Sequence, residues 1–300
     1  MTYYNHKILF AVSLFLLSSC AQAPDESTDS DSLIIDTASD SNFPGGECSN
    51  VVEVTFRDFT ELHPDFERAD KGWGPVKGLI ADTLDSERKP VYNKIRGNCQ
   101  LQPNGTCIPT ADWNNIPMWG IQDDDGKWNA EETFYTWYRD SDLFKNGFGW
   151  IDREQLSRTL KKSITLEKSS ENPENYIFDS SQFFPLSLDE GFGESPKGSG
   201  KNYLFTTEIH LKFEYIENQI FTFRGDDDLW IFVNDRLILD LGGMHAPAEG
   251  VIDFDAQQLN LNITPGNIYS MDIFHAERHT DQSNFRIETN IRCFVPVSID

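Results

Sequence analysis

The chain has 300 residues and a formal net charge of −24, because 49 acidic residues outnumber 25 lysines and arginines. This balance excludes a nucleic-acid binder that works through a basic surface, since affinity for phosphate needs cationic patches. Hydrophobic residues make up 38% of the chain and aromatic residues 13%, which excludes wholesale disorder and suffices for a folded core.

The N-terminus predicts export and a lipid anchor. A short apolar run, Ile8–Leu17, follows Lys7 and is too short to span a membrane. The run leads into Ser18-Ser19-Cys20, which is typical of a bacterial lipobox, with a lipoprotein signal peptide at 1–19 and acyl chains, palmitate among them, on Cys20. The alternative is an ordinary signal peptide that happens to contain a cysteine. Because no Asp follows Cys20, we expect an exported protein, lipid-anchored in the outer membrane at the cell surface.

Residues 20–47 predict a flexible tether behind the lipid anchor. Positions 21–47 hold seven acidic residues and no lysine or arginine, and they end in Pro-Gly-Gly-Glu. Such a segment repels itself and cannot bury a core. We therefore expect one folded domain at 48–294, followed by a short tail at 295–300.

Four cysteines remain once Cys20 is set aside, and an even number in an exported protein suggests two disulfides. Four cysteines allow three pairings. We favour Cys99–Cys107, which closes a Pro-Asn-Gly turn, and Cys48–Cys293, which ties the two ends of the folded unit. Free thiols are the alternative, and no spacing of cysteine and histidine supports zinc.

From residue 51 onward, apolar residues recur mostly at every second position, and turn signals such as Asn234-Asp235 and Pro265-Gly266 separate short runs. This pattern predicts an antiparallel sandwich or barrel. The expected strands, in chain order, are 52–56, 209–215, 220–223, 229–233, 237–241, 251–254, 259–263, 269–274 and 285–291. Short helices are expected at 131–139 and 153–161, and a loop-rich insertion at 100–130.

Three consecutive carboxylates, Asp226, Asp227 and Asp228, follow Gly225 between two expected strands. Adjacent carboxylates repel one another, so a fold retains them where something offsets the charge, and calcium does so with oxygen ligands. The alternative is a solvated acidic hairpin.

A second polar segment, 275–284, joins two expected strands, and loops at the end of a sandwich are where ligand groups often lie. Asp281 and Asn284 offer oxygen ligands in this loop. Glu277 and Arg278 also fit a purely structural ion pair.

Three further sequence features give weaker evidence for a functional site. The pair Gly242-Gly243 allows an unusual turn before His245, which fits a structural hydrogen-bonding histidine better than a metal ligand. Residues 121–132 resemble a twelve-residue calcium loop, but Ile121 occupies the first ligand position, and an acidic surface loop is the alternative. Residues 197–202 resemble a phosphate loop only superficially. Because motifs of serine hydrolases and zinc proteases are also missing, we expect a protein that is not an enzyme.

Seven segments together carry a family resemblance over residues 51–292. Two are long and specific: FTFRGDDDLWIFVNDRLILDLGGMH at 221–245 and IFHAERHTDQSNFRIETNI at 273–291. The others are RDF…HPDFE at 57–67, RKPVYN at 88–93, FYTWYRD at 134–140, FFPL…GFG at 183–193 and NYLFTTEIHLKFEY at 202–215. In these segments the chain resembles the fibro-slime domain of bacterial and slime-mould extracellular proteins, which is related to the protective-antigen-type (PA-fourteen-like) β-sandwich.

The resemblance implies an all-β fold: an antiparallel β-sandwich of the protective-antigen-like type with loop-rich and short helical insertions. In calcium-dependent lectins of that wider superfamily, an Asp pair joined by a cis peptide and an Asn hold calcium, and sugar hydroxyls bind the ion. Carried over, the pair falls on Asp226 and Asp227, with Asn284 and Asp281 from the second loop. Asp228 stands where many relatives have Gly, and this departure crowds or recharges the site.

We therefore expect calcium-dependent carbohydrate binding in adhesion or matrix attachment, with an extracellular carbohydrate or matrix component as the partner. The residues expected to contact that ligand are Asp228, His245, Glu277, Arg278 and His279. Trp230 is expected in the core, whereas Trp113, Trp119 or Trp128 are candidates for stacking on sugar rings. One alternative is a structural or protein-interaction module of a cell-surface matrix without a sugar site, and another is a glycan hydrolase.

Overall fold

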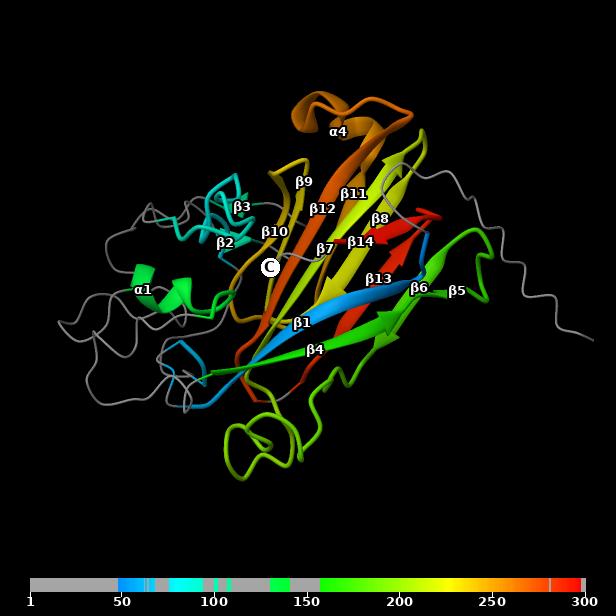
Figure 1. The fold of residues 1–300 in the computed structure, drawn as a ribbon. Helices are drawn as coiled ribbons and strands as arrows, with labels where there is room; N and C mark the ends of the chain where they lie inside the picture. The colour runs from blue at the N-terminus through cyan, green and yellow to red at the C-terminus, as the bar shows by residue number, and fades with distance from the viewer. Residues whose placement is uncertain are drawn as a thin grey trace, which may run out of the picture. The chain divides into compact units, whose positions relative to one another are not determined.

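Two antiparallel sheets face each other in the part of the chain that the structure describes (Figure 1). The first sheet holds, in spatial order, β10 (Arg236–Leu241), β9 (Asp228–Val233), β12 (Asn267–Glu277), β7 (Phe205–Tyr215), β1 (Val51–Phe59) and β4 (Ser157–Thr165), with β14 (Phe294–Pro296) also paired to β7. The second holds β11 (Ala248–Asp253), β8 (Ile220–Gly225), β13 (Phe285–Thr289), β6 (Tyr176–Ser180) and β5 (Glu167–Lys168). The predicted antiparallel β-sandwich is confirmed.

The structure is a computed structural model, and it describes residues 48–61, 63, 65–67, 76–93, 100–101, 107–108, 130–140, 157–280 and 282–297. These residues belong to one unit of the chain, 39–300. Within them, β2 (Gln100–Leu101) pairs with β3 (Cys107–Ile108), and the helices are α1 (Ala130–Tyr135) and α4 (Phe254–Leu261). No helix in the described ranges is long and apolar enough to cross a membrane. The signal peptide, Cys20, the tether, Asp281, the three candidate stacking tryptophans and residues 121–129 lie outside them.

The main core lies between the two sheets and follows from the alternation of side chains along each strand. Most alternate residues of β1 and β7 are apolar and buried against the second sheet, apart from Asp58 and Thr207, whereas the residues between them point to the opposite face. The first sheet contributes, among others, Val52, Val54, Phe56, Ile209, Leu211 and Phe213, and the second contributes Phe221, Phe223, Phe285 and Ile287.

A second apolar cluster covers part of the outer face of the first sheet. Strand β9 is buried at every position, because Trp230 and Phe232 point away from the main core and pack against residues from 59–140. Phe134, Trp137 and Tyr138 supply much of that cover. Trp230 is thus a core residue, as expected, and the segment after β1 folds onto the sheet to bury aromatic surface.

Two predicted elements are wrong. The apolar residues at 259–263 were expected to form a strand, but Phe254–Leu261 is helix α4, whose first turn is capped by the Asp253 side chain accepting from Ala256 N at 3.2 Å. Its buried residues are Phe254 and Leu261, seven positions apart, which is a helical spacing, and Leu259 is 96% exposed.

The helix expected at 153–161 is also wrong over its described part. Ser157–Thr165 is strand β4, which pairs with β1 residue by residue from Val51↔Thr165 to Phe59↔Ser157. It is an edge strand with only Ile164 buried, so its sequence lacks an alternating apolar signal. Pairing with β1 decides its conformation. The helix expected at 131–139 forms only over Ala130–Tyr135.

A disulfide joins the two ends of the folded unit. Cys48 and Cys293 are bonded, with their Cα atoms 4.8 Å apart and 245 positions between them in sequence. Cross-linking residues so far apart restricts the unfolded chain. Cys99 and the side chain of Cys107 lie outside the described residues, and so does the pairing expected between them.

Candidate metal and ligand site

The Asp226–Asp227 turn connects the two sheets. Strand β8 of the second sheet ends at Gly225, and β9 of the first sheet begins at Asp228. The peptide bond between Asp226 and Asp227 is cis. A Cβ atom at Gly225 would lie 2.7 Å from the Asn284 carbonyl oxygen and 2.7 Å from the Phe223 ring, so only glycine lets β8 approach β13 this closely.

Asp226 and Asn284 form a paired contact at the start of β13. Oδ1 of Asp226 accepts from the Asn284 main-chain N–H at 2.5 Å, and its Oδ2 accepts from Asn284 Nδ2 at 2.9 Å. The Asp226 carbonyl oxygen accepts from His275 Nε2 at 2.7 Å. The structure therefore brings together the two loops that the sequence predicts to share a site, whereas Asp281 lies outside the described residues.

Two main-chain N–H groups donate hydrogen bonds to the Asp227 carboxylate. Its Oδ1 accepts from His245 N at 3.0 Å, and its Oδ2 accepts from Arg278 N at 3.1 Å. The side chain is 3% exposed. Burial and the neighbouring carboxylates Asp228 and Asp226 raise its pKa well above the usual range, against a smaller opposing effect of Arg278.

Asp228 has a structural partner. Its Oδ2 lies 2.6 Å from Arg278 Nε in an ion pair whose two side chains are fully buried, and its Oδ1 accepts from Gly243 N at 2.5 Å. The Arg278 guanidinium also lies over the Trp137 ring, 4.9 Å from its centroid. Both residues were expected to contact ligand, and in the structure they hold the strand ends together.

Glu277 is the last residue of β12 and lies where the β9–β12 register brings it opposite Asp227, since Ala276 pairs with Asp228. It is 1% exposed, and its Oε2 atom has no hydrogen-bond partner among the described residues. Burial, followed by the charges of Asp227 and Asp226, raises its pKa well above the usual range. An unpartnered buried carboxylate oxygen at this position needs a proton or a cation.

The two other residues expected to contact ligand border this site. His245 sends its ring nitrogens to the carbonyl oxygens of Leu241 and Ala246, at 3.0 and 2.9 Å, which fits the structural role weighed from the sequence. His279 is partly exposed; its Nδ1 lies 2.7 Å from Thr280 O and its Nε2 lies 3.8 Å from Glu67.

The charges at this site do not balance. Asp226, Asp227, Asp228 and Glu277 are all at most 4% exposed, and Arg278 is the only cationic side chain that ion-pairs with any of them in the described part of the chain. Burial lowers the pKa of His275 to about 4, so that imidazole adds no charge at neutral pH. Four carboxyl groups around one guanidinium need further protons or a further cation.

The donor set fits calcium. The available groups are carboxylate and amide oxygens, which calcium prefers, and the orphaned Glu277 oxygen is among them. Across the described residues, no group of three or more His, Cys, Asp or Glu side chains has the arrangement of a preformed metal site. An ion at this site would therefore also need amide, main-chain, water or ligand oxygens.

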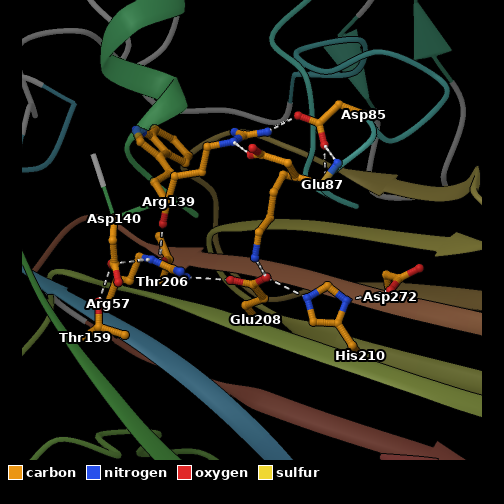
Figure 2. A network of polar contacts seen from close by, with 12 residues as sticks. Arg57, Asp85, Glu87, Arg139, Asp140, Thr159, Thr206, Glu208, His210 and Asp272 are labelled. Atoms are coloured by element: carbon orange, nitrogen blue, oxygen red, sulfur yellow. Dashed lines mark hydrogen bonds and ion pairs between the residues drawn. The ribbon is translucent and has the colours of Figure 1, made fainter. Parts of the chain in front are cut away.

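A second polar network lies on the outer face of the first sheet and was not expected from the sequence. It centres on Glu208 and His210 of β7, with Asp272 of β12 (Figure 2). The alternation of charged residues along β7 was visible in the sequence, but it looks the same for a solvated strand face. Only the fold shows that segments at 85–89 and 135–140 close over these side chains.

No protein-family profile matches the chain, so the fibro-slime resemblance stays a prediction. Among curated proteins, the chain is similar to psiC of Dictyostelium discoideum, with 30% identity over 237 residues, 76% of this chain and 38% of psiC. It is also similar to psiQ of the same organism, with 37% identity over 243 residues, 77% of this chain and 20% of psiQ. The chain thus spans well under half the length of these relatives.

Two solved structures overlap part of the chain. One is the PA14 domain of the MpAFP antifreeze protein, with 12% identity, 44% of this chain, 69% of that domain and a TM-score of 0.23. The other is a PA14 sugar-binding domain from an RTX adhesin, with 11% identity, 42% of this chain, 76% of that domain and a TM-score of 0.23. Overlaps this small say nothing of what this chain binds.

Proposed function

We propose that this protein is an exported, lipid-anchored surface protein whose β-sandwich binds carbohydrate through a calcium ion, in adhesion or matrix attachment. The observation that supports the proposal is the charge imbalance at Asp226, Asp227, Asp228 and Glu277, where Arg278 offsets one of four buried carboxyl groups. A divalent cation supplies the missing charge without protonating the acids.

The carboxylates of Asp226 and Asp227 and the amide oxygen of Asn284 would hold the ion, and Glu277 would add negative charge beside it. A bound calcium ion supplies positive charge and open coordination positions that hydroxyl oxygens of a saccharide can occupy. Asp228 takes no part as a ligand in this proposal, because the fully buried Arg278 guanidinium already neutralises its carboxylate. Its carboxylate instead keeps the Arg278 guanidinium in place beside the site.

The rim of the site is accessible to a ligand. Two loops flank the carboxylates, and each carries an exposed residue, Ala246 in one and Gln282 in the other. Asn284 and His279 are partly exposed between them. Short loops at the end of a sandwich place ligand-binding groups on a rigid scaffold, which suits a binding protein without catalytic machinery.

The lipid anchor at Cys20 rests on the lipobox pattern and is tested separately. The substitution Cys20→Ala is expected to move the protein from the membrane fraction to the soluble exported fraction, because the acyl chains supply its membrane affinity. A Cys20→Ala protein that stays in the membrane fraction would contradict the anchor and leave the sugar-binding proposal standing.

Calorimetric titration of calcium into the chelator-treated full chain tests the metal site. Saturable binding is expected in the wild type and not in Asp226→Asn plus Asp227→Asn. The matched control, Glu214→Gln plus Glu217→Gln, removes the same charge at exposed positions of the same chain and should bind as the wild type does.

A glycan array, probed with calcium and again after chelation, then tests the sugar. Calcium-dependent retention on glycans that the double variant loses is the expected result. A folded wild type that binds no calcium would overturn the proposal. Calcium binding without any glycan signal would favour the alternative, a structural or protein-interaction module in which the ion serves stability.

A further inference from the structure

A cleft of about 950 Å³ lies on the outer face of the first sheet, away from the Asp226–Asp227 turn. Its floor is formed by outward-pointing residues of β1, β4 and β7, among them Arg57, Lys161 and Glu208. Its walls are the segments 86–89 and 135–140, which fold over that face (Figure 2). The proposed calcium site shares none of the residues that line it.

The cleft reverses the charge balance of the chain. Six lysines and arginines line it against four acidic residues, whereas the whole chain has 25 lysines and arginines against 49 acids. Lys161 lies on the β4 side and Arg88, Lys89 and Arg139 lie opposite it, whereas the Lys162 ammonium contacts Glu190 and the Pro185 carbonyl outside the cleft. Arg88 is paired with Asp235 and Asp272, and Arg139 with Asp85 and Glu87, whereas the exposed Lys161 has no ion-pair partner among the described residues and attracts anions.

The floor of the cleft holds a buried ionic network. Glu208, which is 3% exposed, accepts from Arg57 Nη1 at 2.5 Å, from Lys89 Nζ and from His210 Nε2 at 2.6 Å. His210 Nδ1 lies 2.6 Å from Asp272, which Arg88 also contacts. Figure 2 shows Glu208 between Arg57 and His210, with Asp272 beyond. Arg57 also pairs with Asp140, and Arg88 with Asp235, so the charges on this floor form one connected network.

Two buried donors at the cleft lack acceptors. The Tyr138 hydroxyl is fully buried and has no hydrogen-bond partner among the described residues. Arg57 Nε lies 3.4 Å from the half-exposed Asp140 carboxylate but makes no hydrogen bond. Leaving a buried donor unpaired is unfavourable, and native proteins rarely do so without a function for the group.

We propose that this cleft binds an oxyanion, namely the carboxylate, sulfate or phosphate group of a small polar ligand. The Tyr138 hydroxyl and Arg57 Nε donate to its oxygens, and Lys89, Arg139 and Lys161 surround it with positive charge. Glu208 holds Arg57 and Lys89 in position from below. This site is independent of the proposed calcium site, so either can exist without the other.

The test is calorimetry on the calcium-depleted full chain in a low-salt, phosphate-free buffer. The probes are sodium sulfate, inorganic phosphate and glucuronate, with glucose as the uncharged control, and they separate the three sources of the oxyanion. At least one anionic probe is expected to bind saturably while glucose does not. Raising the salt concentration should weaken binding.

Tyr138→Phe is the decisive variant, because its hydroxyl has no hydrogen-bond partner among the described residues and its loss should not lower the melting temperature. Binding is expected to weaken about tenfold or more, as for a lost hydrogen bond to a charged group. Tyr269→Phe, whose hydroxyl bonds Thr264 outside the cleft, is the matched control and should bind as the wild type does. Lys161→Glu, at an exposed wall position, should also weaken binding.

Two results would overturn the proposal. One is a wild type that binds none of the three anions. The other is binding that both Tyr138→Phe and Lys161→Glu leave unchanged, since the anion would then sit elsewhere. The variant Asp226→Asn plus Asp227→Asn is expected to bind the anion normally, which separates failure here from failure of the calcium proposal.

Discussion

The two polar centres of this sandwich differ in how far cationic side chains offset their buried carboxyl groups. At the Asp226–Asp227 turn, four buried carboxyl groups meet one guanidinium, that of Arg278. On the outer face of the first sheet, the buried Glu208 is met by Arg57, Lys89 and His210. Acidity of the whole chain therefore does not decide local charge, since each centre depends on which strand ends and loops meet there.

The difference shows in how each environment shifts the pKa of its carboxyl groups. Burial and like charges raise the pKa of Asp227 and Glu277. Burial opposes ionisation of Glu208 as well, but hydrogen bonding from His210 and the charges of Arg57 and Lys89 outweigh it and lower its pKa to about 2. The first centre thus needs further protons or a cation from outside the chain, whereas the second offsets the Glu208 carboxylate with cations of its own.

The largest effect is expected from Asp228→Asn. It removes the Asp228–Arg278 ion pair and leaves the fully buried Arg278 guanidinium without that counter-charge, so the free energy of unfolding should fall by about 3–5 kcal/mol. Chemical denaturation of the wild type and the variant measures this difference in the free energy of unfolding. The control is Glu174→Gln at the exposed pair with Arg292, which should change little. A small effect of Asp228→Asn would mean that Arg278 has another way to satisfy its charge.

The variant Glu208→Gln comes next, with a loss of about 2–3 kcal/mol at pH 7, because it removes charge-assisted hydrogen bonds from Arg57, Lys89 and His210. Because its pKa is lowered, Glu208 contributes fully to the free energy of unfolding above pH 4.5, the usual pKa of a Glu side chain. This contribution disappears as the pH falls through about 2, the pKa in the folded state. The stability gap between wild type and variant should therefore narrow from pH 6 to pH 3. A gap independent of pH would contradict the ionic account.

A smaller loss of stability is expected from replacing His210, and the contribution of this residue should decrease at alkaline pH. Burial lowers the pKa of His210, but the hydrogen bonds that it donates to the carboxylates of Asp272 and Glu208 outweigh this effect and raise that pKa, with Arg57, Arg88 and Lys89 as the other charged groups packed nearby. A histidine with a raised pKa stabilises the folded state fully below pH 6.5, the usual pKa of a histidine. That stabilisation disappears as the pH rises through the pKa of the folded state. The melting-temperature difference between wild type and His210→Gln should thus be larger at pH 6 than at pH 9. An equal difference at both values would argue that the imidazole is neutral throughout.

The smallest stability effect should have the opposite sign. In calcium-free buffer, Glu277→Gln is expected to raise the melting temperature slightly, because a neutral amide in the same space no longer repels Asp227 and Asp226. The same variant should weaken calcium binding. A clear fall in the melting temperature would show that Glu277 is already compensated, and the contrast between the two centres would break down.

The sequence carries enough information for the sandwich but not for every element. Alternation along β7 and β12 and the turn residues between strands predict the antiparallel sheets. Strand β4 escapes prediction because it is an edge strand with a single buried residue, Ile164, and its pairing partner β1 is about a hundred residues away. Helix α4 escapes because a short apolar run fits both periods until its cap, Asp253, is recognised.

For the sites, the sequence predicts whatever is local. Three consecutive Asp residues and the loop that carries Asn284 are visible as motifs, and the structure brings Asp226 and Asn284 within hydrogen-bonding distance. The roles of the neighbours are not visible, because Arg278 could pair with Glu277 beside it or with Asp228 across the sheet. The cleft is invisible for the same reason, since it joins β1, β7 and a loop near residue 88.

The most direct test of the charge imbalance is the melting temperature of the full chain in calcium and after chelation. The wild type should melt higher with calcium, since a ligand that binds the folded state alone stabilises it. Tyr138→Phe should show the same rise, and Asp226→Asn plus Asp227→Asn should show none. An unchanged wild-type melting temperature across calcium concentrations, or an equal rise in the double variant, would contradict the account.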